Sequence, residues 1–149
     1  MIQVLFVCLG NICRSPMAEA VFRDLIEKEN LTNKISVDSA GTANWHTGKP
    51  PHHGTREKLD EMDISYEGIR ARQVHEQDWQ VFDYIIAMDD QNMDDLTITD
   101  DKKRNVHVAK LTDFVHSKDV DHVPDPYYTG NFDYTYDLVL EGCQNLLQT

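Results

Sequence analysis

A thiol, a glycine-containing turn, a guanidinium and a predicted helix start follow one another in the segment Cys8-Leu9-Gly10-Asn11-Ile12-Cys13-Arg14-Ser15-Pro16. The guanidinium of Arg14 offers a planar fork of donors that matches two oxygens of an oxyanion. Backbone N–H groups in a tight loop and at a helix start also attract anions. The same positive field favours thiolate over thiol at Cys8. The segment therefore predicts an anion-binding loop with a nucleophile at its floor.

The residues around this segment predict the strand and the helix that position it. The apolar run Ile2-Gln3-Val4-Leu5-Phe6-Val7 is typical of a buried parallel strand, which would end at Cys8. Downstream, Ser15 is predicted to cap a helix, and Pro16 suits the first helical turn because its missing N–H costs nothing there. The alternative is an inert buried Cys8 beside a surface Arg14, but strand, loop and helix together favour the functional interpretation.

The whole chain alternates strand-like and helix-like segments, which is typical of a doubly wound α/β fold. Its 149 residues, 40% of them hydrophobic, suit a single domain spanning 1–149. Strands are predicted near 2–8, 35–39, 83–88 and 106–111, and helices near 15–29, 54–63, 89–96 and 131–148. The last helix has the clearest support, because its apolar residues recur at helical spacing from Phe132 to Leu147.

Charge and hydropathy argue against several classes of protein. The formal net charge of −12 disfavours nucleic-acid binding, and no basic stripe with interleaved aromatic residues offsets it. No apolar run approaches the ~18 residues of a membrane span, and the start lacks a secretory signal, so a cytoplasmic location is expected. Acidic pairs at Asp89-Asp90 and Asp94-Asp95 are interpreted as a solvated helix face without calcium-loop spacing. His46, His52 and His53 lack partner cysteines at zinc spacing, so neither a metal nor another cofactor is expected.

The three cysteines do not form the pattern of an extracellular disulfide framework. Cys143 lies near the end of the last predicted helix and is interpreted as an ordinary buried thiol. Cys8 and Cys13 share one loop. We therefore expect Cys13 to capture a sulfenic acid on Cys8 as a reversible disulfide before further oxidation.

At these residues the chain resembles the low-molecular-weight protein tyrosine phosphatases, whose signature is Cys, five residues, Arg, then Ser or Thr. The resemblance continues in the family's order along nearly the whole chain, at Asp38-Ser39-Ala40-Gly41-Thr42, at Phe82-Asp83-Tyr84-Ile85-Ile86-Ala87-Met88-Asp89 followed by Asn92, and at Asp125-Pro126-Tyr127-Tyr128. It implies a four-stranded parallel sheet in the order 2-1-3-4 with helices on both faces. In that order the loop after the first strand is a phosphate-binding loop at a switch point, where open α/β sheets bind ligands.

The resemblance also implies a two-step hydrolysis of phosphotyrosine in protein substrates. Cys8 would attack phosphorus while Asp125 protonates the leaving phenol, and Asp125 would then activate the water that releases inorganic phosphate. Ser15 is expected to hydrogen-bond the sulfur of Cys8, and Asn11 to brace the loop. Besides Arg14, the expected substrate contacts are the loop residues and the cleft walls: Leu9, Gly10, Asn11, Ile12, Cys13, Trp45, Tyr127 and Tyr128.

Three other functions stay open at this point. An arsenate reductase on the same scaffold passes a disulfide along further cysteines, but this chain has none between Cys13 and Cys143. A protein arginine phosphatase carries Thr at the position of Ile12, where an apolar side chain favours an aromatic phosphoester. A non-catalytic phosphate-binding module needs neither Cys8 nor Asp125, so the presence of both argues against it.

Overall fold

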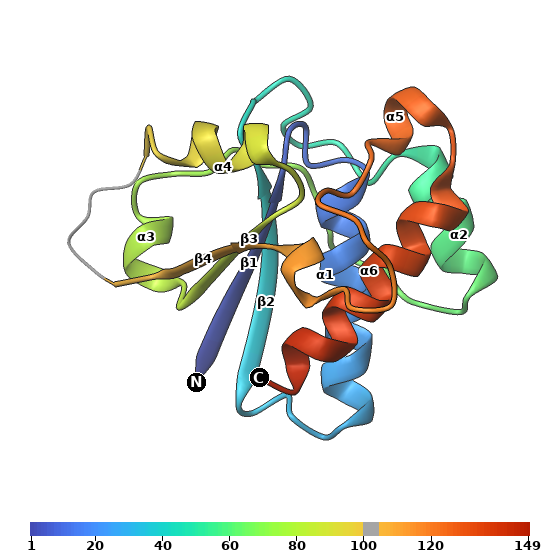
Figure 1. Cartoon of the computed structure of the whole chain (residues 1–149), viewed down its shortest axis with the longest axis horizontal. Coiled ribbons are helices and arrows are strands. Elements are labelled where there is room, and N and C mark those ends of the chain that lie inside the picture. Colours follow the sequence, from blue (N-terminus) through green and yellow to red (C-terminus); the bar gives the residue numbers. More distant parts are fainter. Residues whose placement is uncertain (100–104) are drawn as a thin grey trace.

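The computed structural model describes residues 1–99 and 105–149. A parallel sheet crosses its centre in the order β2-β1-β3-β4, which confirms the expected topology (Figure 1). The strands are β1 (Ile2–Cys8), β2 (Ile35–Gly41), β3 (Tyr84–Ala87) and β4 (His107–Lys110). β1 pairs with β2 in register from Ile2 with Ile35 to Cys8 with Gly41, so the carboxyl ends of these neighbours meet at one edge.

Helices cover both faces of the sheet, as expected (Figure 1). On one face lie α1 (Arg14–Lys28), α2 (His53–Glu61) and α6 (Phe132–Leu147), and on the other lie α3 (Asp78–Val81) and α4 (Asp90–Leu96). The short helices η1 (Leu111–Phe114) and α5 (Pro126–Thr129) connect β4 to α6. Within the described ranges, no helix combines the length and the apolar character that crossing a membrane requires.

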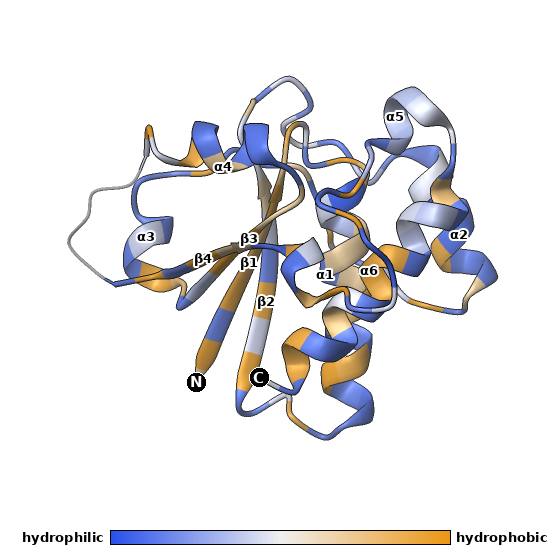
Figure 2. Cartoon of the chain, viewed as in Figure 1, coloured by the Kyte–Doolittle hydropathy of each residue, from blue (hydrophilic) through white to orange (hydrophobic). Residues whose placement is uncertain are grey.

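The core consists of two apolar layers, one on each face of the sheet. Phe6 packs in the layer formed with α1 and α6, whereas Leu5 and Val7 pack in the layer formed with α3 and α4. Successive strand residues point to opposite faces, so a strand covered on both sides needs a continuous apolar run. This explains the composition of residues 2–7. Figure 2 shows hydrophobic stretches along the central strands and many hydrophilic residues on α4 and the outer loops.

Several predicted boundaries need correction. α1 begins at Arg14 with Cys13 as its N-cap, so the prediction that Ser15 caps the helix is wrong; Pro16 does lie in the first turn. β2 extends to Gly41, beyond the predicted end. The helices α3, η1 and α5, each of four residues, were not predicted, because one helical turn is too short to display a repeat.

Candidate active site

The loop between β1 and α1 lies at the carboxyl edge of the sheet, where β1 separates β2 from β3. Cys8 ends β1 and is 3% exposed. Its Sγ accepts a hydrogen bond from the backbone N–H of Asn11 at 3.3 Å and lies 3.0 Å from Oγ of Ser15. The sulfur of Cys8 therefore lies at the floor of the loop with two hydrogen-bonding groups in contact with it.

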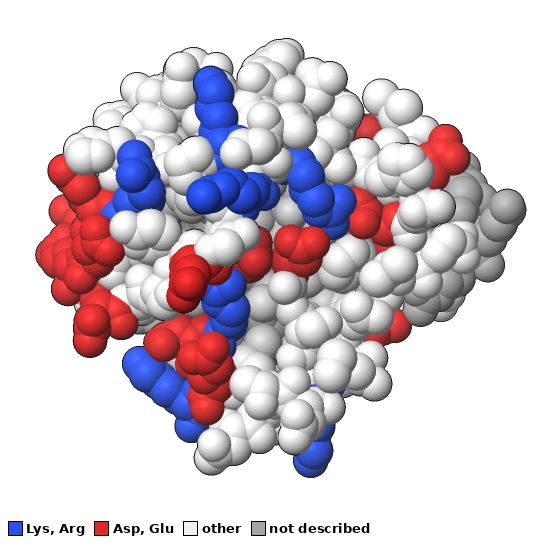
Figure 3. Space-filling view, turned by 180° about the vertical axis from the view of Figure 1, so that it is seen from behind, with Lys and Arg blue, Asp and Glu red and all other residues white. Residues whose placement is uncertain are grey.

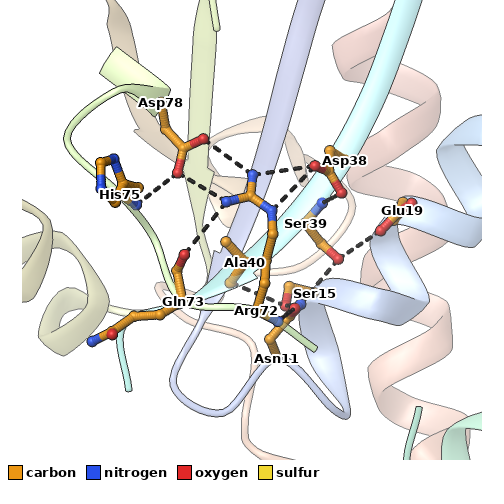
Figure 4. Close-up of polar contacts among 10 residues, drawn as sticks. All are labelled: Asn11, Ser15, Glu19, Asp38, Ser39, Ala40, Arg72, Gln73, His75 and Asp78. Carbon is orange, nitrogen blue, oxygen red and sulfur yellow. Dashed lines mark hydrogen bonds and ion pairs between the residues drawn. The ribbon is translucent and has the colours of Figure 1, made fainter. Parts of the chain in front are cut away.

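Asn11 determines the direction of the hydrogen bonds behind the loop. Its Oδ1 accepts from the backbone N–H of Arg72 at 3.0 Å, so its Nδ2 faces Oγ of Ser15 at 2.7 Å and Oγ of Ser39 at 2.9 Å (Figure 4). Both hydroxyl oxygens accept from Asn11, and each keeps its own hydrogen for another acceptor. For Ser15 the nearer acceptor is Sγ of Cys8 at 3.0 Å, and the carbonyl of Ala40 lies at 3.5 Å. The expected roles of Ser15 and Asn11 agree with this geometry.

The network behind the loop ends at a buried carboxyl group. Oγ of Ser39 donates to Oε1 of Glu19 at 2.6 Å, and Glu19 is only 7% exposed (Figure 4). Burial raises the pKa of Glu19 to about 7; the hydrogen bond from Ser39 acts in the opposite direction, and Asp38 adds to the rise. Glu19 was not predicted from the sequence, because it falls on a helix at a position that looks like an ordinary surface charge.

Arg72 holds the segment that binds Asn11. Its guanidinium lies between Asp38, with Nη2 to Oδ2 at 3.1 Å, and Asp78, with Nη1 to Oδ2 at 3.0 Å (Figure 4). Burial would lower the pKa of Arg72, but Asp78 and Asp38 raise it. β2, α3 and the loop between α2 and α3 are thereby tied to the back of the anion-binding loop.

Arg14, the first residue of α1, is held by buried acceptors. It is 2% exposed, and its Nη1 donates to Oδ2 of Asp89 at 2.7 Å and to the carbonyl of Val123 at 2.9 Å. Its Nη2 lies 3.5 Å from Oδ2 of Asp125. Burial would lower the pKa of Arg14, but Cys8 and the two carboxylates raise it. Nε of Arg14 is buried without a partner among the described residues, so it remains a donor for a bound oxyanion.

The interpretation of Asp89-Asp90 as a solvated helix face is wrong for Asp89. It caps α4 by accepting from the N–H of Asn92 at 2.8 Å, and its second oxygen binds Arg14. Asp90, its neighbour, is exposed and pairs with Lys110, as a surface charge does. The sequence carried a signal for Asp89: a carboxylate just after β3 must lie at the sheet edge next to the end of β1.

Asp125 lies at the mouth of the site, next to Arg14. It caps α5, because its Oδ1 accepts from the N–H of Tyr127 at 3.0 Å and Pro126 occupies the first helical position. Its other oxygen faces Arg14. One oxygen of Asp125 thus caps α5, as expected of an Asp before Pro, and the other lies beside Arg14.

A cleft of about 250 Å³ opens over the loop. Trp45, Tyr127 and Tyr128 line this cleft and are 66%, 52% and 73% exposed, so they offer aromatic surface to a substrate. Two predicted contacts, Asn11 and Arg14, do not line the cleft, whereas the other predicted contacts do. The side chain of Asn11 lies behind the loop, and Arg14 is buried at the start of α1. The cleft residues are Cys8, Leu9, Gly10, Ile12, Cys13, Trp45, His46, Asp125, Tyr127 and Tyr128.

His46 also lines the cleft, although it was not named among the predicted substrate contacts. The ring of His46 lies over the loop, where a Cβ at Gly10 would come within 3.1 Å of its Cδ2. The His52 ring stacks on Phe132 and meets Tyr127 edge-on, and burial lowers its pKa. Across residues 1–99 and 105–149, no three His, Cys, Asp or Glu side chains come together as a metal site.

All three cysteines are free and buried. Burial, with Asp125 and Cys8 nearby, raises the pKa of Cys13 to about 12, so it stays a thiol at neutral pH. Cys143 is fully buried in the core, where its Sγ lies 3.8 Å from the carbonyl of Ala18. The interpretation of Cys143 as an ordinary buried thiol agrees with this position.

Comparisons with known proteins agree with one another. Residues 3–149 match the family model described as low molecular weight phosphotyrosine protein phosphatase. The chain is 56% identical over 147 residues to the low molecular weight protein-tyrosine-phosphatase YfkJ of Bacillus subtilis, covering 99% of this chain and 94% of that protein. The crystal structure of YfkJ has a TM-score of 0.95 at 55% identity, with 99% and 93% covered. The structure of a Drosophila arginine phosphatase has a TM-score of 0.90 at 34% identity, with 99% and 96% covered.

Proposed function

The chain belongs to the low molecular weight phosphotyrosine protein phosphatase family and is a protein-tyrosine phosphatase, and we propose that Cys8, Arg14 and Asp125 carry its reaction. The observation that supports this most directly is the set of donors around Sγ of Cys8. The N–H of Asn11 and the hydroxyl of Ser15 both point at the sulfur, and Cys8 shares its cleft with Asp125.

In the first step, Sγ of Cys8 forms a bond to phosphorus as the bond from phosphorus to the tyrosyl oxygen breaks. Asp125 gives its proton to that oxygen, so the phenol leaves as a neutral molecule. Nε of Arg14 and the loop N–H groups bind the phosphoryl oxygens, whose charge they stabilise in the transition state.

In the second step, Asp125 is a carboxylate and takes a proton from the attacking water. The oxygen of that water bonds to phosphorus while the bond from phosphorus to sulfur breaks. Ser15 donates to the departing thiolate of Cys8, which restores the starting hydrogen bond. The product is inorganic phosphate, and neither step requires a metal or another cofactor.

The test uses Cys8→Ser with a phosphotyrosine peptide, and Cys143→Ala as the matched control. Cys8→Ser should lose essentially all turnover but still bind orthovanadate or phosphate, because Arg14 and the loop amides remain. Cys143→Ala should keep wild-type turnover, since that thiol is buried away from the cleft. Substantial residual turnover in Cys8→Ser would remove Cys8 from the role of nucleophile.

Protein phosphoarginine is the second candidate substrate, because an arginine phosphatase has a similar structure. The floor of the cleft favours phosphotyrosine, since Ile12 packs with Cys13 and Ala71 in a small apolar cluster beside it. A kcat/KM at least tenfold higher for phosphotyrosine than for phosphoarginine peptides is expected. Arsenate reduction by a cysteine relay is disfavoured, because Cys143 is fully buried.

The remaining proposals concern conditions and partners. We propose a cytoplasmic location, because all three cysteines are free thiols. We also propose phosphotyrosine-containing proteins as substrates, because the relatives are named protein-tyrosine phosphatases. Nucleic acid is not a proposed partner, given the net charge of −12. Metal independence is checked by adding EDTA, which should leave turnover unchanged; a loss of turnover that Mg²⁺ or Zn²⁺ restores would contradict it.

A further inference from the structure

Three cations without a carboxylate partner belong to segments around the cleft. In this acidic chain, five of the eleven Lys and Arg side chains in the described ranges bind carboxylates, namely Arg14, Lys28, Lys58, Arg72 and Lys110. Within residues 1–99 and 105–149, no carboxylate oxygen lies within 4 Å of the side-chain nitrogens of Lys49, Arg56 or Arg70. These three residues, named here the cationic shoulder, belong to segments that are bonded to the loop of His46 and to the anion-binding loop.

Backbone and side-chain contacts attach the cationic shoulder to the cleft. The N–H of Ala71 donates to the carbonyl of Lys49 at 2.9 Å, and the N–H of Gly48 donates to the carbonyl of Ala71 at 2.8 Å. Lys49 and Arg70 therefore lie on paired segments. Nζ of Lys49 lies 3.3 Å from Nδ1 of His46, and the ring of His46 lines the cleft.

Arg56 joins the same surface from α2. Its N–H binds the carbonyl of His52, and the N–H of His52 binds the carbonyl of Ile12 at 2.6 Å, so the start of α2 is fixed to the anion-binding loop. Nε of Arg56 is buried and has no partner among the described residues. Figure 3, which views the molecule from behind, shows Lys and Arg side chains across the upper half of this face, toward the carboxyl edge of the sheet.

Building on the proposed function, we propose that the cationic shoulder binds acidic residues that flank the phosphotyrosine of the substrate on one side. The proposal rests on charge complementarity. With a net charge of −12, the chain as a whole repels acidic peptides. Salt screens that repulsion beyond ~8 Å, so cations beside the cleft that have no carboxylate partner can still attract the acidic residues of a bound peptide. Helix α5 lines another part of the cleft with Tyr127 and Tyr128, and it is capped by Asp125, so this part of the lining offers no cation. The preference should therefore depend on which side carries the acidic residues.

The experiment compares KM values for three phosphotyrosine peptides: one with two aspartates before the phosphotyrosine, one with two aspartates after it, and one with alanines at all four positions. One of the acidic peptides should have a KM about three- to tenfold below that of the alanine peptide, as expected for two exposed charge contacts. The double variant Lys49→Gln/Arg70→Gln should abolish the difference, as should high salt. Lys34→Gln, which removes an exposed cation before β2, should preserve it.

Turnover of p-nitrophenyl phosphate separates this proposal from the function on which it rests. The double variant should hydrolyse that small ester at the wild-type rate, because the cationic shoulder lies outside the cleft that holds the phosphate. Equal KM values for the three peptides, with normal turnover of the ester, would overturn the proposal and leave the function intact. If the three KM values are equal and the wild type binds phosphatidylserine vesicles while the double variant does not, the cationic shoulder would be a membrane-binding surface instead.

Discussion

Glu19→Gln tests whether the carboxyl group behind the anion-binding loop is protonated in the folded protein near neutral pH. Glutamine keeps Oε1 as an acceptor for Ser39 and removes only the charge. The pKa of Glu19 is raised by burial to about 7 from its ordinary value of 4.5, so the folded state favours the neutral acid. A group with a raised pKa contributes stability that is fully present below pH 4.5 and is lost as the pH rises toward 7.

The magnitude follows from that difference. A change of one in pKa corresponds to about 1.4 kcal/mol, so ionisation of Glu19 in the unfolded chain costs the folded state about 3 kcal/mol between pH 4.5 and pH 8. The Gln variant does not experience this loss. Its free energy of unfolding should therefore be close to that of the wild type at pH 4.5 and about 3 kcal/mol higher at pH 8.

The assay is urea unfolding at intervals between pH 4.5 and pH 8, analysed as the difference between variant and wild type. All other titrating groups contribute equally to both proteins and cancel in that difference. Glu27→Gln is the matched control, because it makes the same chemical change on the exposed side of α1. A difference for Glu19→Gln that stays constant with pH would mean that folding does not raise the pKa of Glu19, and it would refute the reasoning.

Three further predictions concern the catalytic groups. Asp89→Asn should lower kcat/KM about 10–100-fold, because it removes a charged hydrogen bond from the buried Arg14. The control Asp90→Asn removes an exposed charge and should change kcat/KM less than twofold. Equal effects of the two variants would show that only the net charge matters. Asp125→Asn should lower kcat/KM for phenyl phosphate by about 10²–10⁴-fold and much less for p-nitrophenyl phosphate, whose leaving group needs no proton; equal losses would place the acid elsewhere. Mild peroxide should inactivate the enzyme reversibly by forming a Cys8–Cys13 disulfide, which mass spectrometry should detect. After the same treatment, Cys13→Ala should regain little activity with dithiothreitol. Full recovery of activity in that variant would mean that Cys13 is only a packing residue.

The catalytic loop was predictable from the sequence because its signals are local. The strand, the turn and the helix start occur within one segment, and each has its own composition. The N-cap was wrong for a physical reason: Ser15 has the side chain of a good cap, but its hydroxyl is committed to Cys8 and Asn11. The preference of serine for the N-cap position is thus overridden when tertiary hydrogen bonds give its hydroxyl other partners.

The supporting residues were harder to predict, because they meet only in three dimensions. Asp89 is 75 residues from Arg14 along the chain, and the two are neighbours only because β3 lies beside β1. His46 looks like one more residue of a polar loop until its ring is placed over Gly10. Glu19 lies among exposed helix charges in the sequence, and only its contact with β2 makes it a buried acid.

The charges at the site explain how an acidic protein can bind a phosphate dianion. The carboxylates of Asp89 and Asp125 already surround Arg14, so this arginine cannot provide a net positive charge by itself. The backbone N–H groups of the loop and the start of α1 must supply the remaining attraction, which their fixed orientation allows without reorganisation.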